Sequence, residues 1–246
     1  MENKSKLKWE SFEQKLGSWS SKIYPFYLAG GFDRIYDKLK LDSKKGIKLA
    51  PESQNTFRAF EECDINNLKA IVVGLSPYHS LNNGVIVADG LCLSCSITKY
   101  PQPSLSTFFD GIERELYDGL CVPCNRNTDL KYLAFQGVLL LNAALTTPIG
   151  KPEDHVLLWD EFMKYLFEKV LDVHGVPIIL LGKEAQKLER YINPFNTIFK
   201  LSHPSFAARS GIEWDTEGVF SKVNKILEYK HGRGISWFDE DGEIPF

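Results

Sequence analysis

Four apolar runs along the chain each end in a short polar or glycine-containing segment. Buried parallel strands are typically continuous apolar runs, and an open parallel α/β sheet binds its ligands outside the carboxyl ends of its strands. The pattern therefore predicts that the four tails meet at one crevice, and we expect the functional site there. The runs are residues 70–73, 138–141, 176–181 and 198–201, and they are followed by GLSPYH, Asn142, Gly182-Lys183 and SHPS.

Segments with helical periodicity separate these runs, and no internal repeat is present. Apolar spacing predicts helices around residues 9–19, 105–112 and 157–173. Strands that alternate with helices indicate an α/β fold: a single-domain open sheet over residues 1–246, mostly parallel, with helices on both faces. We expect a long loop at residues 119–129 and a tail at 234–246 that is ordered late or poorly.

The composition fits an ordinary globular protein. The 246 residues are 43% hydrophobic, enough for one well-packed core. No apolar stretch approaches the length of a membrane span, and the N-terminal MENKSKLKWESF lacks the apolar core of a signal peptide. Five cysteines, an odd number, fit a reducing compartment. We therefore expect a cytoplasmic protein without a membrane partner.

The formal net charge of −3 argues against a uniformly basic nucleic-acid binder but leaves local fields open. Charge is distributed unevenly, because residues 183–209 carry five Lys or Arg against two Glu. A solvated surface of mixed charge is the ordinary role of any single one of these residues.

The cysteines are spaced in a way that superficially resembles a metal-ligand set, Cys92-x-x-Cys95 followed by Cys121-x-x-Cys124. Residues 91–95 are predicted to form a strand, however, and strand residues three apart point to opposite faces. We therefore expect buried strand thiols and loop thiols rather than a metal site. Neither a Walker A nor a G-x-G-x-x-G motif is present, so we expect no nucleotide cofactor.

The tails, taken with their neighbouring segments, identify a family. Six segments resemble, in order and spacing, the successive motifs of uracil-DNA glycosylases, and the resemblance covers residues 49–237. The segments are GLSPYH (74–79), DGLCLSCS (89–96), PQPSLSTFFDGIEREL (101–116), LAFQGVLLLNAALT (133–146), PIILLGKEAQK (177–187) and LSHPSFAA (201–208).

The resemblance implies how the site handles a nucleotide flipped out of DNA, the only state in which the base can be reached. Asn142 would make paired hydrogen bonds to the pyrimidine edge, beside Leu75 and Leu93, and Tyr78 would wall off the C5 position. His203 would donate a hydrogen bond to O2 as negative charge develops on the leaving base. The ordinary alternatives are a turn-capping asparagine, a core tyrosine and a surface histidine. The residues that would contact DNA phosphates are Pro77, Pro103, Ser104, Gly182, Lys183 and Ser205.

The chain departs from the family pattern at several positions. Ser76 replaces an aspartate that serves water and the cationic sugar, and Asp89 is either its substitute or, equally, a loop carboxylate. Leu93 stands where the family stacks a phenylalanine, and the loop at 80–88 is longer than usual. The family's wedge leucine falls on Ala207, so Phe206 or Arg209 would fill the emptied base stack.

The resemblance implies a monomeric, monofunctional DNA glycosylase that acts on DNA and leaves an abasic site without a metal or cofactor. Its substrate would be uracil or, because of the departures, a modified pyrimidine such as a hydroxymethylated or glucosylated cytosine of phage DNA, which would indicate a defence role. The alternative is a catalytically weak DNA-binding accessory protein that kept the cleft. The sequence leaves open the base and the preference for single or double strands.

Overall fold

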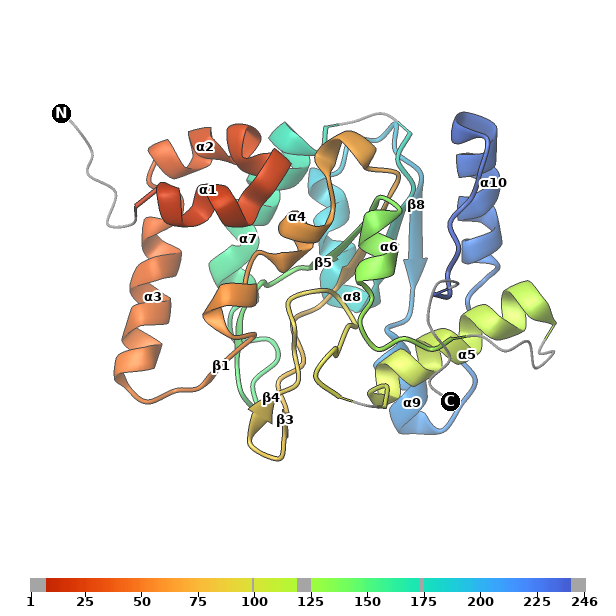
Figure 1. The fold of residues 1–246 in the computed structure, drawn as a ribbon, viewed down its shortest axis with the longest axis horizontal. Coiled ribbons are helices and arrows are strands. Elements are labelled where there is room, and N and C mark those ends of the chain that lie inside the picture. The colour runs from red at the N-terminus through yellow and green to blue at the C-terminus, as the bar shows by residue number, and fades with distance from the viewer. Residues whose placement is uncertain (1–7, 99, 119–124, 173–174, 240–246) are drawn as a thin grey trace.

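The computed structural model describes residues 8–98, 100–118, 125–172 and 175–239 (Figure 1). The helices are α1 (Glu10–Leu16), α2 (Ser20–Leu28), α3 (Asp33–Lys44), α4 (Arg58–Glu62), α5 (Pro103–Tyr117), α6 (Lys131–Phe135), α7 (Val156–Tyr165), α8 (Gly182–Gln186), α9 (Pro204–Ser210) and α10 (Val219–His231). The strands are β1 (Leu49–Ala50), β2 (Ala70–Gly74), β3 (Leu81–Asn82), β4 (Val85–Ile86), β5 (Val138–Asn142), β6 (Thr147–Pro148), β7 (Ile178–Leu181) and β8 (Ile198–Leu201). Short 3₁₀ helices lie at Gly17–Trp19, Ser53–Asn55, Ile65–Asn67 and Lys187–Tyr191, and the π-helical turn Leu166–Val170 extends α7.

The central sheet has four parallel strands in the order β5-β2-β7-β8. All residues of β2 and β5 are buried, as expected for parallel strands covered by helices. Gly74 is paired with Asn142, and Leu181 with Leu201, so the four strands end at one edge. The strand order reverses between β2 and β7, and a sheet of this kind binds ligands outside the strand ends at such a switch point. The predicted open α/β sheet and the convergence of the four tails are confirmed.

Helices lie at both ends of the molecule, on either side of the central sheet. In Figure 1, α1, α2 and α3 group at one end of the molecule, and α5, α9 and α10 group at the other. Helix α5 begins with Pro103, a residue preorganised for the first helical turn, and packs against α9. The buried Trp214 donates its indole N–H to the Ser202 carbonyl over 2.9 Å, which fixes the chain just before α9.

Three sequence predictions of helices are confirmed, and two other predictions are wrong. Residues 91–95 form turns rather than a strand, because Leu93 has a φ of 64° and the Asp89 side chain organises the segment. The tail prediction is wrong for residues 234–239, where Trp237 and Phe238 are buried in the core, and residues 240–246 lie outside the described residues. In the predicted loop at 119–129, residues 119–124 lie outside the described residues, as do Cys121 and Cys124.

The long loop at 80–88 contains a small hairpin. Strands β3 and β4 pair across Asn83 and Gly84, which both have positive φ as a tight hairpin turn requires. Lys48 donates to the Gly84 carbonyl over 2.8 Å and ties the hairpin to the segment before β1. The loop therefore forms an ordered element, and its residues Ile86 and Ala88 pack with Tyr78.

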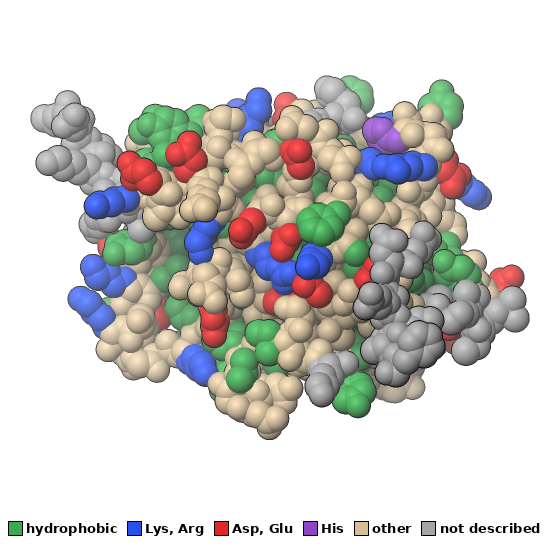
Figure 2. All heavy atoms as spheres, in the orientation of Figure 1, with side chains coloured by type: hydrophobic (Ala, Val, Ile, Leu, Met, Phe, Trp, Pro, Cys, Tyr) green, Lys and Arg blue, Asp and Glu red, His purple; other side chains and the backbone are tan. Residues whose placement is uncertain are grey.

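Charges of both signs are interspersed over the face of the molecule shown in Figure 2, rather than gathered in a large basic patch. Within the described ranges, no helix has the length and apolar character that crossing a membrane requires.

Candidate active site

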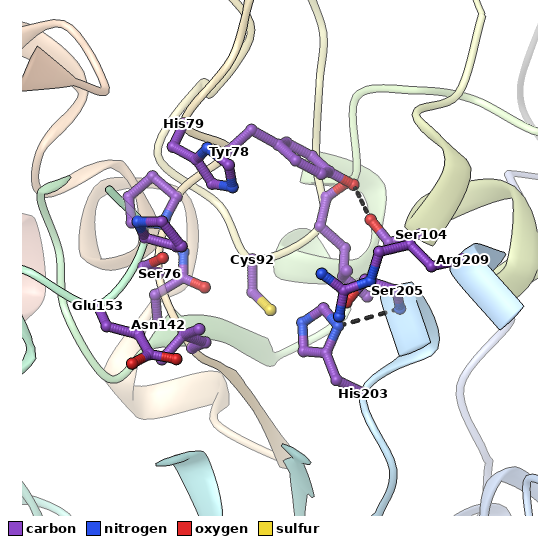
Figure 3. Close-up of a pocket in the computed structure, with 14 residues that line it drawn as sticks. Ser76, Tyr78, His79, Cys92, Ser104, Asn142, Glu153, His203, Ser205 and Arg209 are labelled. Atoms are coloured by element: carbon purple, nitrogen blue, oxygen red, sulfur yellow. Dashed lines mark hydrogen bonds between the residues drawn. The ribbon is translucent and has the colours of Figure 1, made fainter. Parts of the chain in front are cut away.

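A cavity of about 220 Å³ opens at the carboxyl edge of the sheet (Figure 3). The tails of β2, β5 and β8 contribute to its wall, together with the first turn of α5 and the loop between β6 and α7. The lining residues are Leu75, Ser76, Pro77, Tyr78, His79, Cys92, Leu93, Ser104, Asn142, Pro152, Glu153, His203, Ser205 and Arg209. Ten of the residues selected from the sequence as base-binding, catalytic or DNA-binding are thereby brought together: Leu75, Ser76, Pro77, Tyr78, Leu93, Ser104, Asn142, His203, Ser205 and Arg209.

Gly74 marks the point on which the polar groups converge. A Cβ atom added there would lie 2.6 Å from Cys92 Sγ, 2.9 Å from Asn142 Oδ1 and 3.9 Å from His203 Nε2. The first two distances are too short for a Cβ atom, so glycine is what allows the Cys92 thiol and the Asn142 amide to approach the end of β2. A glycine at this strand end is a packing requirement of the cavity.

Asn142 is the most informative polar residue of the cavity. Its side chain lies at the end of β5, and the residue is only 4% exposed. No described residue hydrogen bonds its side-chain amide, although buried amides are normally satisfied by the protein. The amide therefore offers its donors and its acceptor to whatever occupies the cavity.

His203 presents a hydrogen-bond donor to the same cavity. It is the N-cap of α9, where its Nδ1 accepts a hydrogen bond from the Ser205 backbone N–H over 3.1 Å. Burial, reinforced by the nearby Arg209 charge, lowers the pKa of His203 to about 4. The ring is therefore neutral near pH 7, and with Nδ1 as the acceptor its proton is on Nε2.

The Tyr78 hydroxyl is held by the protein. It donates to the Leu93 carbonyl over 3.0 Å and lies 2.8 Å from Ser104 Oγ, which then donates to it. Burial raises the pKa of Tyr78, so the group is a phenol rather than a phenolate. These bonds fix the ring at the cavity wall, and they occupy the Ser104 proton that the sequence assigned to a DNA phosphate.

The sequence offered Asp89 as a substitute for the missing aspartate, and the structure places it elsewhere. Asp89 does not line the cavity and is 1% exposed. Its carboxylate forms an ion pair with Arg58 at 2.9 Å and accepts hydrogen bonds from Leu91 N, Ser94 Oγ and Ser96 N. A carboxylate with its oxygens occupied in this way holds a loop, so Asp89 fits the alternative of a loop carboxylate.

Two of the predicted phosphate contacts lie in an adjoining hollow, which is lined by Gly182 and Lys183 together with Glu153, His203 and Arg209. Gly182 has a φ of 84°, and an added Cβ would lie 3.0 Å from His203 Cβ, so the glycine allows both the turn and the position of the histidine. Pro103 and Phe206 line neither hollow, and Phe206 is 55% exposed on α9.

The five cations of residues 183–209 differ in their pairing. Lys187, Arg190 and Lys200 form ion pairs with Glu184, Asp160 and Glu189. In the described part of the chain, neither Lys183 nor Arg209 has such a partner. Of these five cations, the two without an acidic partner are therefore the ones that line the hollow.

Four cavity residues were not selected from the sequence as part of the site: His79, Cys92, Pro152 and Glu153. His79 ends the GLSPYH segment, so its position was a usable signal. Burial raises the pKa of the Cys92 thiol to about 12, against a smaller effect of a backbone hydrogen bond with Gly74, which makes it an unreactive thiol. Pro152 and Glu153 carry no sequence signal, because they lie in a loop outside the recognised motifs.

Comparison with known proteins gives a consistent answer. The model of the uracil DNA glycosylase superfamily matches residues 60–228. The uracil-DNA glycosylase of Acinetobacter baumannii is 32% identical over 228 residues, which cover 89% of this chain and 91% of that protein. The uracil-DNA glycosylase of Coxiella burnetii is 35% identical over 211 residues, 84% of this chain and 87% of that protein.

The same fold is found in a solved structure. The crystal structure of mimivirus uracil-DNA glycosylase superposes with a TM-score of 0.80 at 19% identity, covering 95% of this chain and 90% of that one. The family match spans well over half of the chain and includes all four strands of the central sheet. The chain belongs to the uracil-DNA glycosylase superfamily.

Proposed function

We propose that the protein is a monofunctional DNA glycosylase that flips a pyrimidine nucleotide out of DNA and hydrolyses its N-glycosidic bond, with uracil as the substrate. The observation that carries the proposal is Asn142, a buried side-chain amide that no described residue hydrogen bonds. Its oxygen and its N–H₂ group match N3–H and O4 on the edge of a uracil ring. Family membership and the activity of the bacterial relatives agree with this assignment.

His203 fits the electronic demand of the bond cleavage. When the N1–C1′ bond breaks, its electron pair moves onto the pyrimidine and negative charge develops at O2. A neutral imidazole that donates from Nε2 stabilises this charge more in the transition state than in the ground state, which is what lowers a barrier. Tyr78, with its hydroxyl fixed, would form the wall at C5.

The DNA backbone would meet the cavity mouth. Lys183 and Arg209 provide charges that no described acid neutralises, and Ser205 lies at the first turn of α9. Contacts of this kind position DNA without reading its sequence. The exposed Phe206, next to the buried Ala207, is the side chain available to fill the space left by a flipped base.

The test is excision from labelled oligonucleotides, single-stranded and duplex, that carry one uracil, thymine or cytosine at the same position, followed by alkaline cleavage of abasic sites. We expect cleavage at uracil alone. Asn142→Ala should abolish most of it, whereas Asn82→Ala, which changes an exposed asparagine of β3, should leave the rate unchanged. Cleavage that is insensitive to Asn142→Ala would overturn the proposed site.

A modified pyrimidine is the second candidate substrate. Leu93 lines the cavity with a backbone φ of 64°, at the position where the family stacks a flat aromatic ring. A branched aliphatic side chain there changes the shape available to the base. Excision from phage DNA that contains hydroxymethylated or glucosylated cytosine, with uracil left intact, would support this candidate. Tight DNA binding without excision of any base would instead indicate an accessory protein.

A further inference from the structure

We propose that Glu153 supplies the carboxylate that faces the water and the sugar in the reaction, in place of the aspartate for which this chain has Ser76; the inference rests on the proposed glycosylase function. The two residues reach the cavity from different places, Ser76 from the tail of β2 and Glu153 from the loop between β6 and α7.

The position of Glu153 is the first step of the argument. Of the described residues that line the cavity, Glu153 alone carries a carboxylate, and it also lines the adjoining hollow. Figure 3 shows Glu153, Ser76 and Asn142 together on one side of the cavity, with His203 and Ser205 on the other and Cys92 between. A base held between Asn142 and His203 would therefore share the cavity with this acid.

The second step is that the Glu153 carboxylate is available. Throughout the described ranges, no ion pair or hydrogen bond engages it, in contrast to Asp89 with its four partners. Its backbone, on the other hand, is fixed, because the Glu153 carbonyl accepts from Val156 N at the start of α7. The side chain is exposed and unpaired while its backbone is fixed, so the carboxylate is free to turn toward a substrate in the cavity.

The third step concerns the loop that carries Glu153. His155, two residues away, is fully buried between Asp42 of α3 and Thr146. Its Nε2 lies 3.1 Å from Asp42 Oδ2, and its Nδ1 lies 2.9 Å from Thr146 Oγ1. Trp159 donates to the same Thr146 hydroxyl over 2.8 Å. The loop is also tied to the first motif, since Gly150 N donates to the His79 carbonyl over 2.8 Å. The buried cluster thus holds Glu153 at a set distance from the tail of β2.

The hydrolysis of the N1–C1′ bond can be written with water and the side chains that line the cavity. Water attacks C1′ as the N1–C1′ bond breaks, and the bonding pair leaves with the pyrimidine, whose O2 is stabilised by His203. Glu153 accepts the proton of the attacking water, leaves a 1′-hydroxyl on the abasic sugar, and returns the proton to the base or to solvent. Before proton transfer, its negative charge offsets the positive charge of the oxocarbenium-like sugar. Ser76 can hold the water but provides no charge.

The experiment compares Glu153→Gln with Asp154→Asn, which removes the same charge from the neighbouring exposed residue outside the cavity. Single-turnover excision of uracil should fall roughly a hundredfold in Glu153→Gln, within the range for a lost general base, and stay unchanged in Asp154→Asn. Affinity for an abasic oligonucleotide should stay equal or increase in Glu153→Gln, because a carboxylate near phosphates weakens binding. The Tm should be that of wild type.

A second variant adds a test in the other direction. In the Glu153→Gln background, Ser76→Asp should restore excision, because it returns a carboxylate to the same side of the cavity from the tail of β2. Wild-type activity that persists in Glu153→Gln would overturn the role of Glu153 and leave the glycosylase function standing. A wild-type protein that excises no base would overturn both. Equal losses of excision, DNA affinity and Tm in Glu153→Gln would make the residue structural and also overturn the proposal.

Discussion

Two groups of polar residues surround the same strand ends and differ in what satisfies them. The anchor group, which comprises Asp42, Arg58, Asp89 and His155, does not line the cavity and is bonded to other protein groups. The cavity group, which comprises Ser76, Asn142, Glu153, Lys183 and Arg209, has side chains that no described residue bonds or pairs with. Of this group only Asn142 is buried, and a buried polar group costs free energy unless it is paired. Its unpaired amide therefore marks the place of a ligand, beside the exposed side chains of Glu153, Lys183 and Arg209.

The contrast separates two uses of a charged side chain. A carboxylate surrounded by donors stabilises the loop that it organises, and it has little left to give to a substrate. A carboxylate without partners adds little to stability and remains available for chemistry. Substitutions in the anchor group should therefore change stability, and substitutions in the cavity group should change excision or DNA binding.

The largest effect is expected for Asp89→Asn in the anchor group. The change removes the charge that faces Arg58 at 2.9 Å and turns an amide toward the Leu91 and Ser96 N–H groups, which are donors themselves. Arg58 keeps Asp129 and Glu62, so the cost should be at the lower end of the range for a broken buried pair, about 3 kcal/mol. Thermal unfolding should show a fall in Tm of roughly 6 to 12 °C.

The control for Asp89→Asn is Glu62→Gln, which removes a more exposed partner of the same Arg58 and should cost much less. If Asp89→Asn instead kept the wild-type Tm and lost excision, Asp89 would belong with the cavity group and the comparison would fail.

His203 belongs to both groups, and its titration is the next prediction. Its Nδ1 is satisfied by Ser205 N, while its Nε2 faces the cavity. Burial and the Arg209 charge lower its pKa to about 4 from the ordinary 6.5. The unfolded chain therefore binds this proton first, and the stability linked to His203 is complete above pH 6.5 and is lost as pH falls toward 4.

NMR titration of the imidazole nitrogens should show the His203 midpoint near pH 4. In urea unfolding, the stability difference between wild type and His203→Ala should shrink as pH falls through that window. A midpoint near 6.5 would mean that the ring is solvated and the site is more open than the structure indicates.

The sequence predicted the strand ends well, because a buried parallel strand has a simple local pattern. The apolar runs before Gly74 and Asn142, and the polar tails after them, are patterns of consecutive residues and can be read from the sequence directly. The helices of residues 9–19, 105–112 and 157–173 followed from their apolar spacing for the same reason.

The parts that failed depend on contacts between distant residues. Asp89 is recruited by Arg58 of α4, thirty-one positions earlier in the chain, and this contact converts the segment at 91–95 from an expected strand into turns. The loop that carries Glu153 is held in part by the bond between His155 and Asp42, which is far away in sequence. No local pattern reports such contacts, so the sequence pointed to Asp89, which does not line the cavity, and gave no signal for Glu153, which does.

Asn142→Ala tests the cavity group, and we expect it to lower the excision rate without lowering stability, a smaller effect than that of Asp89→Asn. The side chain has no described hydrogen-bond partner, so its removal leaves no donor or acceptor of the protein unsatisfied. Uracil excision should fall at least tenfold, equivalent to about 1.4 kcal/mol of barrier, while the Tm changes little. A loss of stability that matches the loss of excision would place Asn142 in the anchor group instead.

The smallest effect is expected for Lys183→Ala at the cavity mouth. Lys183 has no described acidic partner, whereas Lys200 in β8 is paired with Glu189 at 2.6 Å. Each cation that neutralises a DNA phosphate adds about 0.9 to the slope of log affinity against log salt concentration, because counterions are released. Binding to an abasic oligonucleotide at several salt concentrations should therefore give a slope shallower by about one unit in Lys183→Ala. Lys200→Ala should keep the wild-type slope, since its charge is already neutralised within the protein. Equal slopes in all three proteins would place the DNA path away from the mouth, and a reduced slope in Lys200→Ala alone would move it toward the outer face of β8.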